Sequence, residues 1–221
     1  MGNVRVLEIK KSVFENNDLE ADKLRSDLKE KKTLLINLMS SPGSGKTSSV
    51  LRIIEKLGAK YKIGIMEADI DSSVDAEKVA ATGTKTIQIH TDGMCHLDAG
   101  MTRTGIESDE MQGLDLVILE NVGNLVCPAE FDTGAVKNMM ILSVPEGDDK
   151  PLKYPLMFSI VDLVLINKID AIEFFDFDKD AVKNRIKNLN KKAEVIEVSA
   201  KENIGFDAVA DWIEKQIEDW K

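Results

Sequence analysis

The chain has 221 residues, of which 43% are hydrophobic and 31% are charged, a composition typical of a globular protein. Its formal net charge of −10 argues against a nucleic-acid partner held on a broad basic face. Because it contains neither an apolar run of about eighteen residues nor a signal-peptide core, we expect no membrane span and a cytoplasmic location.

The segment 1–32 is polar and precedes the first long apolar run. Leu19, Leu24 and Leu28 lie near helical spacing, which indicates an amphipathic helix at 18–31. The first dozen residues are predicted to form a strand or an arm. We expect this N-terminal segment to pack on a single domain that spans 33–221.

Apolar runs alternate with amphipathic patterns along 33–221. After the first apolar run, which starts at Thr33, strands are predicted at 62–68, 85–90, 114–120, 136–144, 161–167 and 194–198. Helices are predicted from Thr47 to Gly58 and at 77–82, 98–107, 178–192 and 206–220. This alternation predicts an α/β fold with a mostly parallel, doubly wound sheet. Ligands of such folds bind beyond the carboxyl ends of the strands, where the polar motifs of this chain also fall.

The stretch 33–47, TLLINLMSSPGSGKT, has the strand–loop–helix setting of a phosphate-binding P-loop. Its glycines let backbone N–H groups turn toward a polyphosphate, and the following helix adds its positive N-terminal dipole. Lys46 can reach the β- and γ-phosphates, and the Thr47 hydroxyl is placed for a magnesium ion. Ser40 occupies the motif's first glycine position, so its backbone must adopt a conformation open to other residues. The predicted nucleotide-binding residues of this stretch are Gly43, Ser44, Gly45, Lys46, Thr47 and Ser48.

Two later motifs indicate that the nucleotide is a guanine nucleotide. The predicted strand 161–167 leads into Asn167-Lys168-Ile169-Asp170, an N-K-x-D pattern. The carboxylate of Asp170 can accept hydrogen bonds from N1–H and the exocyclic amine of guanine, whereas adenine would leave it unpaired. Asn167 can tie this loop to the P-loop, and the stem of Lys168 can cover the base. Ser199, Ala200 and Lys201 form an S-A-K element similar to the one that lines guanine in GTP-binding domains.

Magnesium ligands are predicted at the ends of two strands. Glu120 ends the strand LDLVILE and stands where many GTPases hold magnesium through an aspartate and water. The candidates after strand 62–68 are Asp69, Asp71 and Asp75. We choose Asp75, with Thr47 and Glu120, as the magnesium set; Asp71 is equally well explained as a helix cap.

Hydrolysis should depend on Lys46, Thr47, Glu120 and Gly123, whose N–H can meet the γ-phosphate. Asn124 stands where some faster GTPases carry a water-positioning glutamine. No intrinsic arginine finger is obvious, and Arg103 is a candidate. We therefore expect slow hydrolysis by the isolated protein.

The two cysteines of the chain predict a second metal site. Cys95-His96 follows the strand 85–90, and Cys127 follows Glu120 and Gly123, so both loops lie after strand carboxyl ends. Two thiolates and an imidazole suit Zn²⁺ or Ni²⁺, and a fourth ligand could be water or come from a second subunit. Cys127 lies four residues beyond Gly123, at most about 13 Å of extended chain. A loop that tightens on the γ-phosphate could therefore move a metal ligand and change metal affinity or dimerisation.

The stretches SSPGSGKT, DGMCHLDAG, LENVGNLVCPAEFD and NKID, in this order, resemble the HypB family of nickel-incorporation GTPases in nickel–iron hydrogenase maturation. The resemblance covers residues 33–201. It implies a P-loop GTPase of the signal-recognition-particle and MinD-like class, GTP-favoured homodimerisation, and a metal site on Cys95, His96 and Cys127. It also implies nickel delivery to the hydrogenase large subunit with a small zinc-containing nickel chaperone as partner. The sequence departs from the family at Ser40 and lacks the N-terminal cysteine motif and histidine-rich tract of some members, which speaks against nickel storage.

Three alternatives remain open at this stage. The related urease-maturation GTPase would carry a C-P-H triplet, where this chain has Cys127-Pro128-Ala129. A P-loop kinase acting on a small molecule would need a substrate lid and would not need N-K-x-D. A metal-binding protein that uses nucleotide only for stability would show the same metal affinity with GTP and with GDP.

Overall fold

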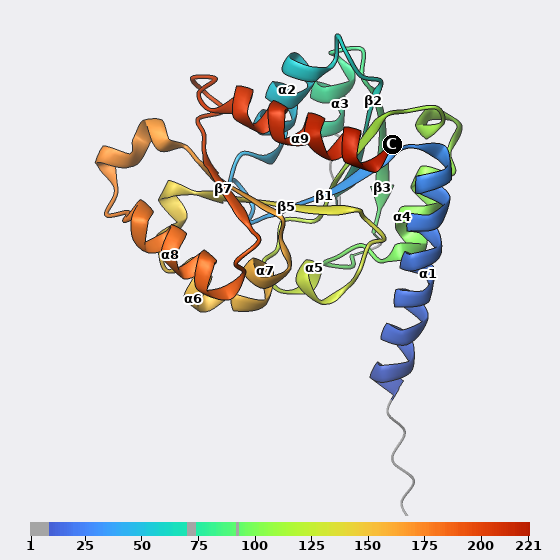
Figure 1. Cartoon of the computed structure of the whole chain (residues 1–221), viewed down its shortest axis with the longest axis horizontal. Helices are drawn as coiled ribbons and strands as arrows, with labels where there is room; N and C mark the ends of the chain where they lie inside the picture. The colour runs from blue at the N-terminus through green and yellow to red at the C-terminus, as the bar shows by residue number, and fades with distance from the viewer. Residues whose placement is uncertain (1–8, 70–73, 92) are drawn as a thin grey trace, which may run out of the picture.

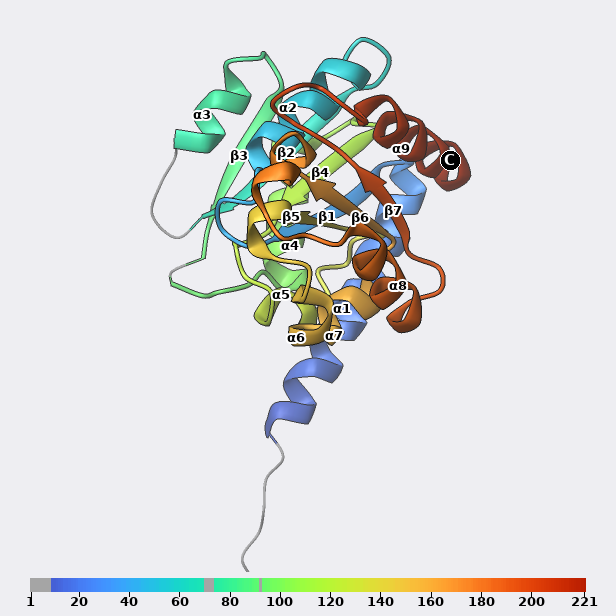
Figure 2. The same ribbon diagram turned by 90° about the vertical axis from the view of Figure 1, so that its left-hand side faces the viewer.

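The computed structural model describes residues 9–69, 74–91 and 93–221. Within these ranges the chain forms a seven-stranded sheet in which all paired neighbours run parallel (Figures 1 and 2). The strands are β1 (Leu34–Ser40), β2 (Ile63–Asp69), β3 (Lys85–His90), β4 (Leu116–Glu120), β5 (Lys137–Ser143), β6 (Leu163–Asn167) and β7 (Glu194–Glu197). The α-helices are α1 (Ile9–Lys31), α2 (Lys46–Leu57), α3 (Val74–Ala80), α4 (Ala99–Ile106), α5 (Cys127–Glu130), α6 (Lys150–Lys153), α7 (Pro155–Ile160), α8 (Lys179–Leu189) and α9 (Phe206–Trp220). Short 3-10 turns are η1 (Asp109–Met111), η2 (Val144–Glu146) and η3 (Ile169–Phe174).

The strand order β3-β2-β4-β1-β5-β6-β7 places β1 at the centre of the sheet. From β1 the chain first builds the β4, β2 and β3 side and then crosses to β5, so the strand order reverses next to β1. Such a switch point is where nucleotides bind in doubly wound folds. Residues of β1, β4 and β6 are buried throughout, which explains why their sequences read as continuous apolar runs.

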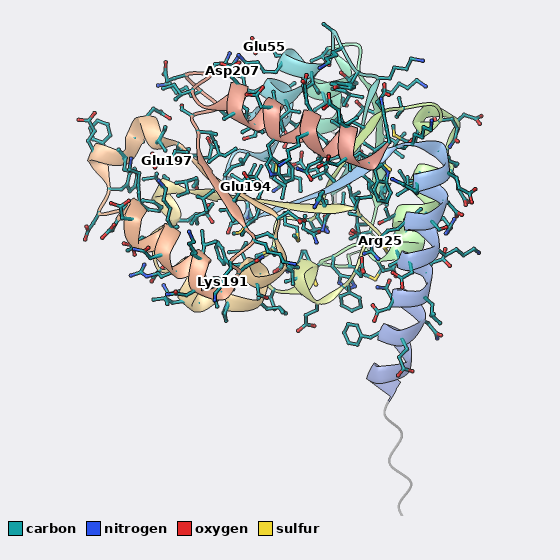
Figure 3. The ribbon with its side chains drawn as sticks, viewed as in Figure 1. Arg25, Glu55, Lys191, Glu194, Glu197 and Asp207 are labelled. Atoms are coloured by element: carbon teal, nitrogen blue, oxygen red, sulfur yellow. The ribbon has the colours of Figure 1, made fainter. Side chains whose placement is uncertain are left out.

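Helices cover both faces of the sheet, as Figures 1 and 2 show. On one face, α2 and α9 bury side chains such as Ile53 and Ile213 against strand residues including Ile36. On the other face lie α1, α4, α5, α7 and α8, with Leu28 and Phe158 fully buried. Charged side chains cover the outside of these layers, among them Glu55, Lys191 and Asp207 (Figure 3).

The doubly wound α/β fold is confirmed, and the predicted strands are present within one or two residues of their expected ends. The N-terminal prediction is wrong from residue 9 onward, because α1 already begins at Ile9 instead of following a strand or arm; residues 1–8 lie outside the described part. Leu24 and Leu28 are buried as expected, whereas Leu19 is 71% exposed. The first half of α1 carries little apolar periodicity and is attached by the contacts of Phe14 and Asn17 described below.

Further differences concern the helices. The helices α5, α6 and α7 were not expected between the predicted strands. The helix α8 ends at Leu189, and this leucine is 38% exposed instead of facing inward. No helix among the described residues is long and apolar enough to span a bilayer.

Candidate nucleotide and metal sites

The P-loop connects β1 to α2 at the centre of the sheet. The strand ends at Ser40, which is fully buried. Its backbone is extended, a conformation that residues other than glycine adopt without strain. Gly43 and Gly45 take the left-handed φ values of 73° and 100° that favour glycine. Lys46 begins α2, and its Nζ donates to the Ser40 hydroxyl at 3.1 Å. The serine at the motif's first position therefore holds the P-loop lysine.

A cavity of about 250 Å³ opens above this loop. It is lined by Gly43, Gly45, Lys46, Thr47, Ser48, Leu51, Asp75, Lys78 and Glu120. The structure thus brings together Lys46 and the three residues predicted to hold magnesium, which are Thr47, Asp75 and Glu120. Hydroxyl and carboxylate oxygens are the ligands Mg²⁺ prefers, so these side chains fit the ion. The Asp69 side chain and Asp71 lie outside the described part.

Glu120 is 4% exposed and ends β4 inside the cavity wall. Asp75 accepts from Lys78 Nζ at 2.6 Å, and this bond raises the pKa of Lys78. Lys78 was not singled out in the sequence, because a lysine on a short, charged helix carries no pattern. Its place in the cavity adds a second cation to the wall that Lys46 also lines.

The loop after β4 rests on the P-loop. A Cβ added to Gly123 would lie 3.1 to 3.3 Å from atoms of Pro42, so glycine permits this close approach. Between Glu120 and Gly123, Asn121 is fully buried and donates from Nδ2 to Asn37 Oδ1 at 3.0 Å.

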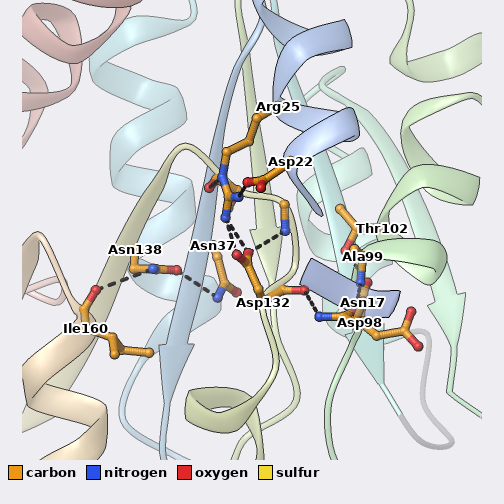
Figure 4. A network of polar contacts seen from close by, with 12 residues as sticks. Asn17, Asp22, Arg25, Asn37, Asp98, Ala99, Thr102, Asp132, Asn138 and Ile160 are labelled. Carbon is orange, nitrogen blue, oxygen red and sulfur yellow. Dashed lines mark hydrogen bonds and ion pairs between the residues drawn. The ribbon is translucent and has the colours of Figure 1, made fainter. Parts of the chain in front are cut away.

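A second hydrogen bond between side-chain amides extends the Asn121–Asn37 pair across the sheet. In it, Asn37 Nδ2 donates to Asn138 Oδ1 at 3.1 Å (Figure 4). These buried amides orient the loop that carries Gly123. Sequence patterns did not reveal them, since single polar residues inside apolar strands have no recognisable spacing.

Asn167 joins the guanine motifs to the P-loop. Its Nδ2 donates to the Ser44 carbonyl at 2.9 Å, and its Oδ1 accepts from the Ala200 N–H at 3.1 Å. The predicted tie between this loop and the P-loop is confirmed. A Cβ on Gly45 would lie 2.5 Å from Asn167 Nδ2, so the amide closes over the glycine. Three sequence-distant loops therefore form one hydrogen-bonded unit.

The other predicted guanine-binding residues lie around Asn167. Lys168 has a left-handed φ of 63° and donates from Nζ to the Gly43 carbonyl at 2.7 Å. Ser199 Oγ donates to Asp170 Oδ1 at 2.5 Å and thereby orients the carboxylate. Lys201 is largely exposed and pairs with Glu202 at 3.0 Å.

Two arginines make contacts that the sequence motifs did not predict. Arg52 of α2, which had no motif to mark it, donates to the carbonyls of Ala200 at 2.8 Å and Lys201 at 3.2 Å. The suggestion of Arg103 as an arginine finger is wrong. Arg103 pairs with Asp27 at 2.6 Å and also with Glu20, both on α1, and it does not line the P-loop cavity.

The predicted metal ligands lie on two neighbouring loops. Hydrogen bonding to the Cys127 thiol and burial raise the pKa of Cys95, which indicates that the loops carrying the two cysteines adjoin. Cys95 Sγ lies 3.9 Å from His96 Nδ1, and burial lowers the pKa of His96. Over the described ranges, no three His, Cys, Asp or Glu side chains already converge as a metal-binding group.

The donor set still fits a thiophilic transition metal, because two thiolates and a neutral imidazole are available within two adjoining loops. Completing the site requires a small movement of a ligand or a ligand from outside the chain. His90 ends β3 and is exposed, as expected for a residue outside the metal site.

Known protein families and solved structures resemble this chain in sequence and in fold. Residues 34–197 match the family model "CobW/HypB/UreG, nucleotide-binding domain". The hydrogenase maturation factor HypB of Azotobacter vinelandii is 43% identical over 213 residues, which cover 96% of this chain and 70% of that protein. The crystal structure of HypB from Helicobacter pylori in complex with nickel is similar with a TM-score of 0.86 and 34% identity, over 92% of this chain and 96% of that one. The signal recognition particle receptor FtsY of Elizabethkingia anophelis shares the fold alone, with a TM-score of 0.53 and 14% identity over 82% of this chain and 65% of that one.

Fold and site together define a P-loop nucleotide-binding domain of the CobW/HypB/UreG class. Within that class, the chain belongs to the HypB family of hydrogenase maturation factors. The resemblance seen in the four sequence motifs is confirmed.

Proposed function

We propose that this HypB-family chain is a cytoplasmic, GTP-hydrolysing metallochaperone that inserts nickel into the large subunit of nickel–iron hydrogenase. The observation that carries the proposal is that the Cys95-His96 loop adjoins the Cys127 segment, where His96 stacks on Phe131 at 3.8 Å. Cys127 follows closely after Gly123, which rests on the P-loop. A metal ligand is thus connected to the nucleotide loop by a short stretch of backbone.

GTP is the nucleotide that the base-binding loops favour. Asp170, held by Ser199, accepts from the N1–H and amine of guanine, and Lys168 covers the base from the P-loop side. Lys46 binds the β- and γ-phosphates, and Thr47, Asp75 and Glu120 are the residues to hold magnesium. When bound, Mg²⁺ neutralises charge that develops on the phosphates.

Nickel is the cargo of Cys95, His96 and Cys127. The thiols must lose their protons to bind it, and the neutral imidazole supplies a nitrogen lone pair. Zn²⁺ accepts the same ligands, and the nickel complex of the Helicobacter pylori relative supports nickel.

The switch works through the loop from Gly123 to Cys127. In the GTP state Gly123 is drawn toward the γ-phosphate, and after hydrolysis it is released, so Cys127 moves relative to Cys95. The GTP state favours a homodimer in which the second subunit can complete the metal coordination. A small zinc-containing nickel chaperone supplies the metal, and the hydrogenase large subunit receives it.

The test is the molecular mass of the nickel-loaded protein, measured by light scattering with GDP and with a non-hydrolysable GTP analogue. We expect a monomer with GDP and a dimer with the analogue. Cys127→Ala should stay monomeric under both conditions, and Cys95→Ala should behave in the same way. His96→Ala should weaken nickel binding, and His90→Ala is its matched control because His90 is exposed and outside the site.

A mass that ignores nucleotide and metal in the wild type contradicts the shared switch. Nickel binding that survives replacement of both cysteines contradicts the proposed ligand set. GTP turnover that requires an added phosphate acceptor would favour a kinase instead.

A further inference from the structure

The candidate nickel ligand His96 belongs to a series of three contacting rings that reaches the helix α1. His96 stacks on Phe131 with ring centroids 3.8 Å apart and planes 13° apart. Phe131 lies one residue beyond α5, and the ring of Phe14 on α1 packs against it at 4.9 Å in a tilted arrangement. The imidazole is therefore held by the loop that follows Cys127, and this loop is in turn held by α1.

A second contact of α1 connects the same two loops. Asn17 Nδ2 donates to the carbonyl of Asp132 at 2.9 Å, and its Oδ1 accepts from the N–H of Ala99 at 2.9 Å. Figure 4 shows Asn17 between the two segments. Asp132 follows the Cys127 helix, and Ala99 begins α4 directly after the Cys95-His96 loop. One amide thus spans the two ligand-bearing loops.

The helix itself is firmly attached where these contacts occur. Arg25 pairs with the Asp132 carboxylate at 2.5 Å and donates from Nε to the Ala135 carbonyl at 3.0 Å (Figure 4). Gly134 has a φ of 76°, and a Cβ there would lie 2.7 Å from the Leu24 side chain, so α1 lies against this backbone. On the other loop's side, Arg103 of α4 pairs with Asp27 and Glu20.

We infer that α1 is a brace for the metal site and that Phe131 and Asn17 are positioning residues for His96. This inference rests on the proposed ligand set of Cys95, His96 and Cys127. A histidine ring can rotate broadly about χ2, and a metal needs the ring-plane lone pair aimed at it. Stacking on Phe131 fixes the plane, and Asn17 fixes the separation of the two loops. Residues that orient metal ligands in this way typically change metal affinity by about 10- to 100-fold.

The experiment is nickel affinity, measured by competition with a colorimetric chelator, for full-length wild type, Phe131→Leu and Asn17→Leu. We expect each variant to bind nickel about 10-fold more weakly. Phe131→Tyr keeps the ring and should retain wild-type affinity. Leu19→Ala is the matched control on α1, because Leu19 is 71% exposed. GDP affinity and melting temperature, recorded for every variant, separate a local effect on the metal from general loss of structure.

A second measurement distinguishes positioning from simple destabilisation. The thiolate-to-nickel charge-transfer spectrum of Phe131→Leu should approach that of His96→Ala, because both lose the imidazole from the metal. In a His96→Ala background, Phe131→Leu should cause no further loss of affinity. Equal nickel affinity in wild type, Phe131→Leu and Asn17→Leu would overturn the inference, as would a full further loss in the double variant.

The same data separate this inference from the proposed function. If His96→Ala and Cys127→Ala weaken nickel binding while Phe131→Leu and Asn17→Leu do not, the ligand set stands and the brace is wrong. If His96→Ala leaves nickel affinity unchanged, the ligand set is wrong and the brace falls with it.

Discussion

The nucleotide loops and the metal loops of this protein are built in opposite ways. On the nucleotide side, Asn167 bonds to the P-loop and to the 199–201 loop, while Lys168 bonds to the Gly43 carbonyl. Arg52 adds two bonds to backbone carbonyls from the helix behind. The parts that recognise GTP are therefore connected to one another before any ligand arrives.

On the metal side, the connections come from outside. The loops of Cys95 and Cys127 adjoin, but the described side chains do not yet form a three-ligand group. The loops that carry the ligands are attached through Phe131 and Asn17 to the helix α1.

This difference between a preconnected nucleotide site and an incomplete metal site fits the way in which each ligand is bound. A preorganised site binds without paying for rearrangement and gives the specificity that a switch requires. A site that is completed only by movement can release its metal when the movement reverses, as the proposed delivery of nickel requires. The following predictions disturb these connections one at a time.

The largest effect is expected when the base contact itself is changed. Asp170→Asn replaces one acceptor oxygen by a donor amide, so GDP affinity should fall about 10³- to 10⁴-fold. Xanthosine diphosphate should gain affinity relative to GDP, because xanthine carries a carbonyl where guanine has its amine. Calorimetric titration with both nucleotides measures the change. Asp176→Asn is the matched control, since Asp176 is exposed and lies a few residues farther along; a similar loss in that variant would contradict the assignment.

A smaller effect should follow when the nucleotide loops are pushed apart. Gly45→Ala meets a φ of 100° and places Cβ 2.5 Å from Asn167 Nδ2, so stability should fall by about 2–4 kcal/mol with a parallel loss of GDP affinity. Gly43→Ala meets a φ of 73° but open space, and it should cost about 1–2 kcal/mol. Chemical denaturation of both variants gives the two values. Equal values would mean that the contact between Gly45 and Asn167 contributes nothing.

The contrast between the two regions also explains what could be predicted from the sequence. The strands were predictable because their apolar runs are continuous, and Asn167 was predictable because N-K-x-D has a fixed chemical meaning. The nucleotide side is therefore largely visible in the sequence. Lys78, Arg52 and the amides of Asn37, Asn121 and Asn138 were missed there, since isolated polar residues carry no spacing.

On the metal side, only the metal ligands could be predicted from the sequence. Cys95, His96 and Cys127 are chemically conspicuous, but the residues that hold them are not. Asn17 reaches Asp132 across 115 residues and Ala99 across 82, and no local pattern indicates such a pairing. The early start of α1 was missed for the same reason. The first half of this helix is attached by the contacts of Phe14 and Asn17 and not by an apolar stripe.

A modest effect is expected from loosening one nucleotide loop. Arg52→Met keeps the aliphatic stem but loses the hydrogen bonds to the Ala200 and Lys201 carbonyls. GDP affinity should fall by about 3- to 10-fold, which corresponds to roughly 1 kcal/mol. Nickel affinity should not change, because Arg52 is on the opposite face of the sheet. A loss of nickel affinity equal to the loss of GDP affinity would show that the two regions are less independent than their contacts indicate.

The smallest effect concerns the strand that leads into the 199–201 loop. Glu197 lies near the end of β7 beside α8 (Figure 3) and accepts from Lys179 at 2.7 Å and Lys183 at 2.5 Å. Partial burial pushes the pKa of Glu197 upward, but the hydrogen bonds from both lysines outweigh it, so the pKa lies below the ordinary value of 4.5. A lowered native pKa contributes stability that is present above the unfolded-state pKa and is lost as the pH falls through the native pKa.

Glu197→Gln should therefore reduce the free energy of unfolding at pH 7 by about 0.5 kcal/mol, a small value because both lysines are partly exposed and solvent screens the pairs. The difference between variant and wild type should shrink as the pH falls below 4.5 and disappear once the native carboxylate is protonated. Urea denaturation across this pH range measures it, with Glu202→Gln as a control on the neighbouring exposed loop. A difference that stays constant with pH would mean that Glu197 stabilises the protein through packing and not through its ion pairs. The strand β7 would then resemble the metal loops, which are held by packing and amide contacts with another element.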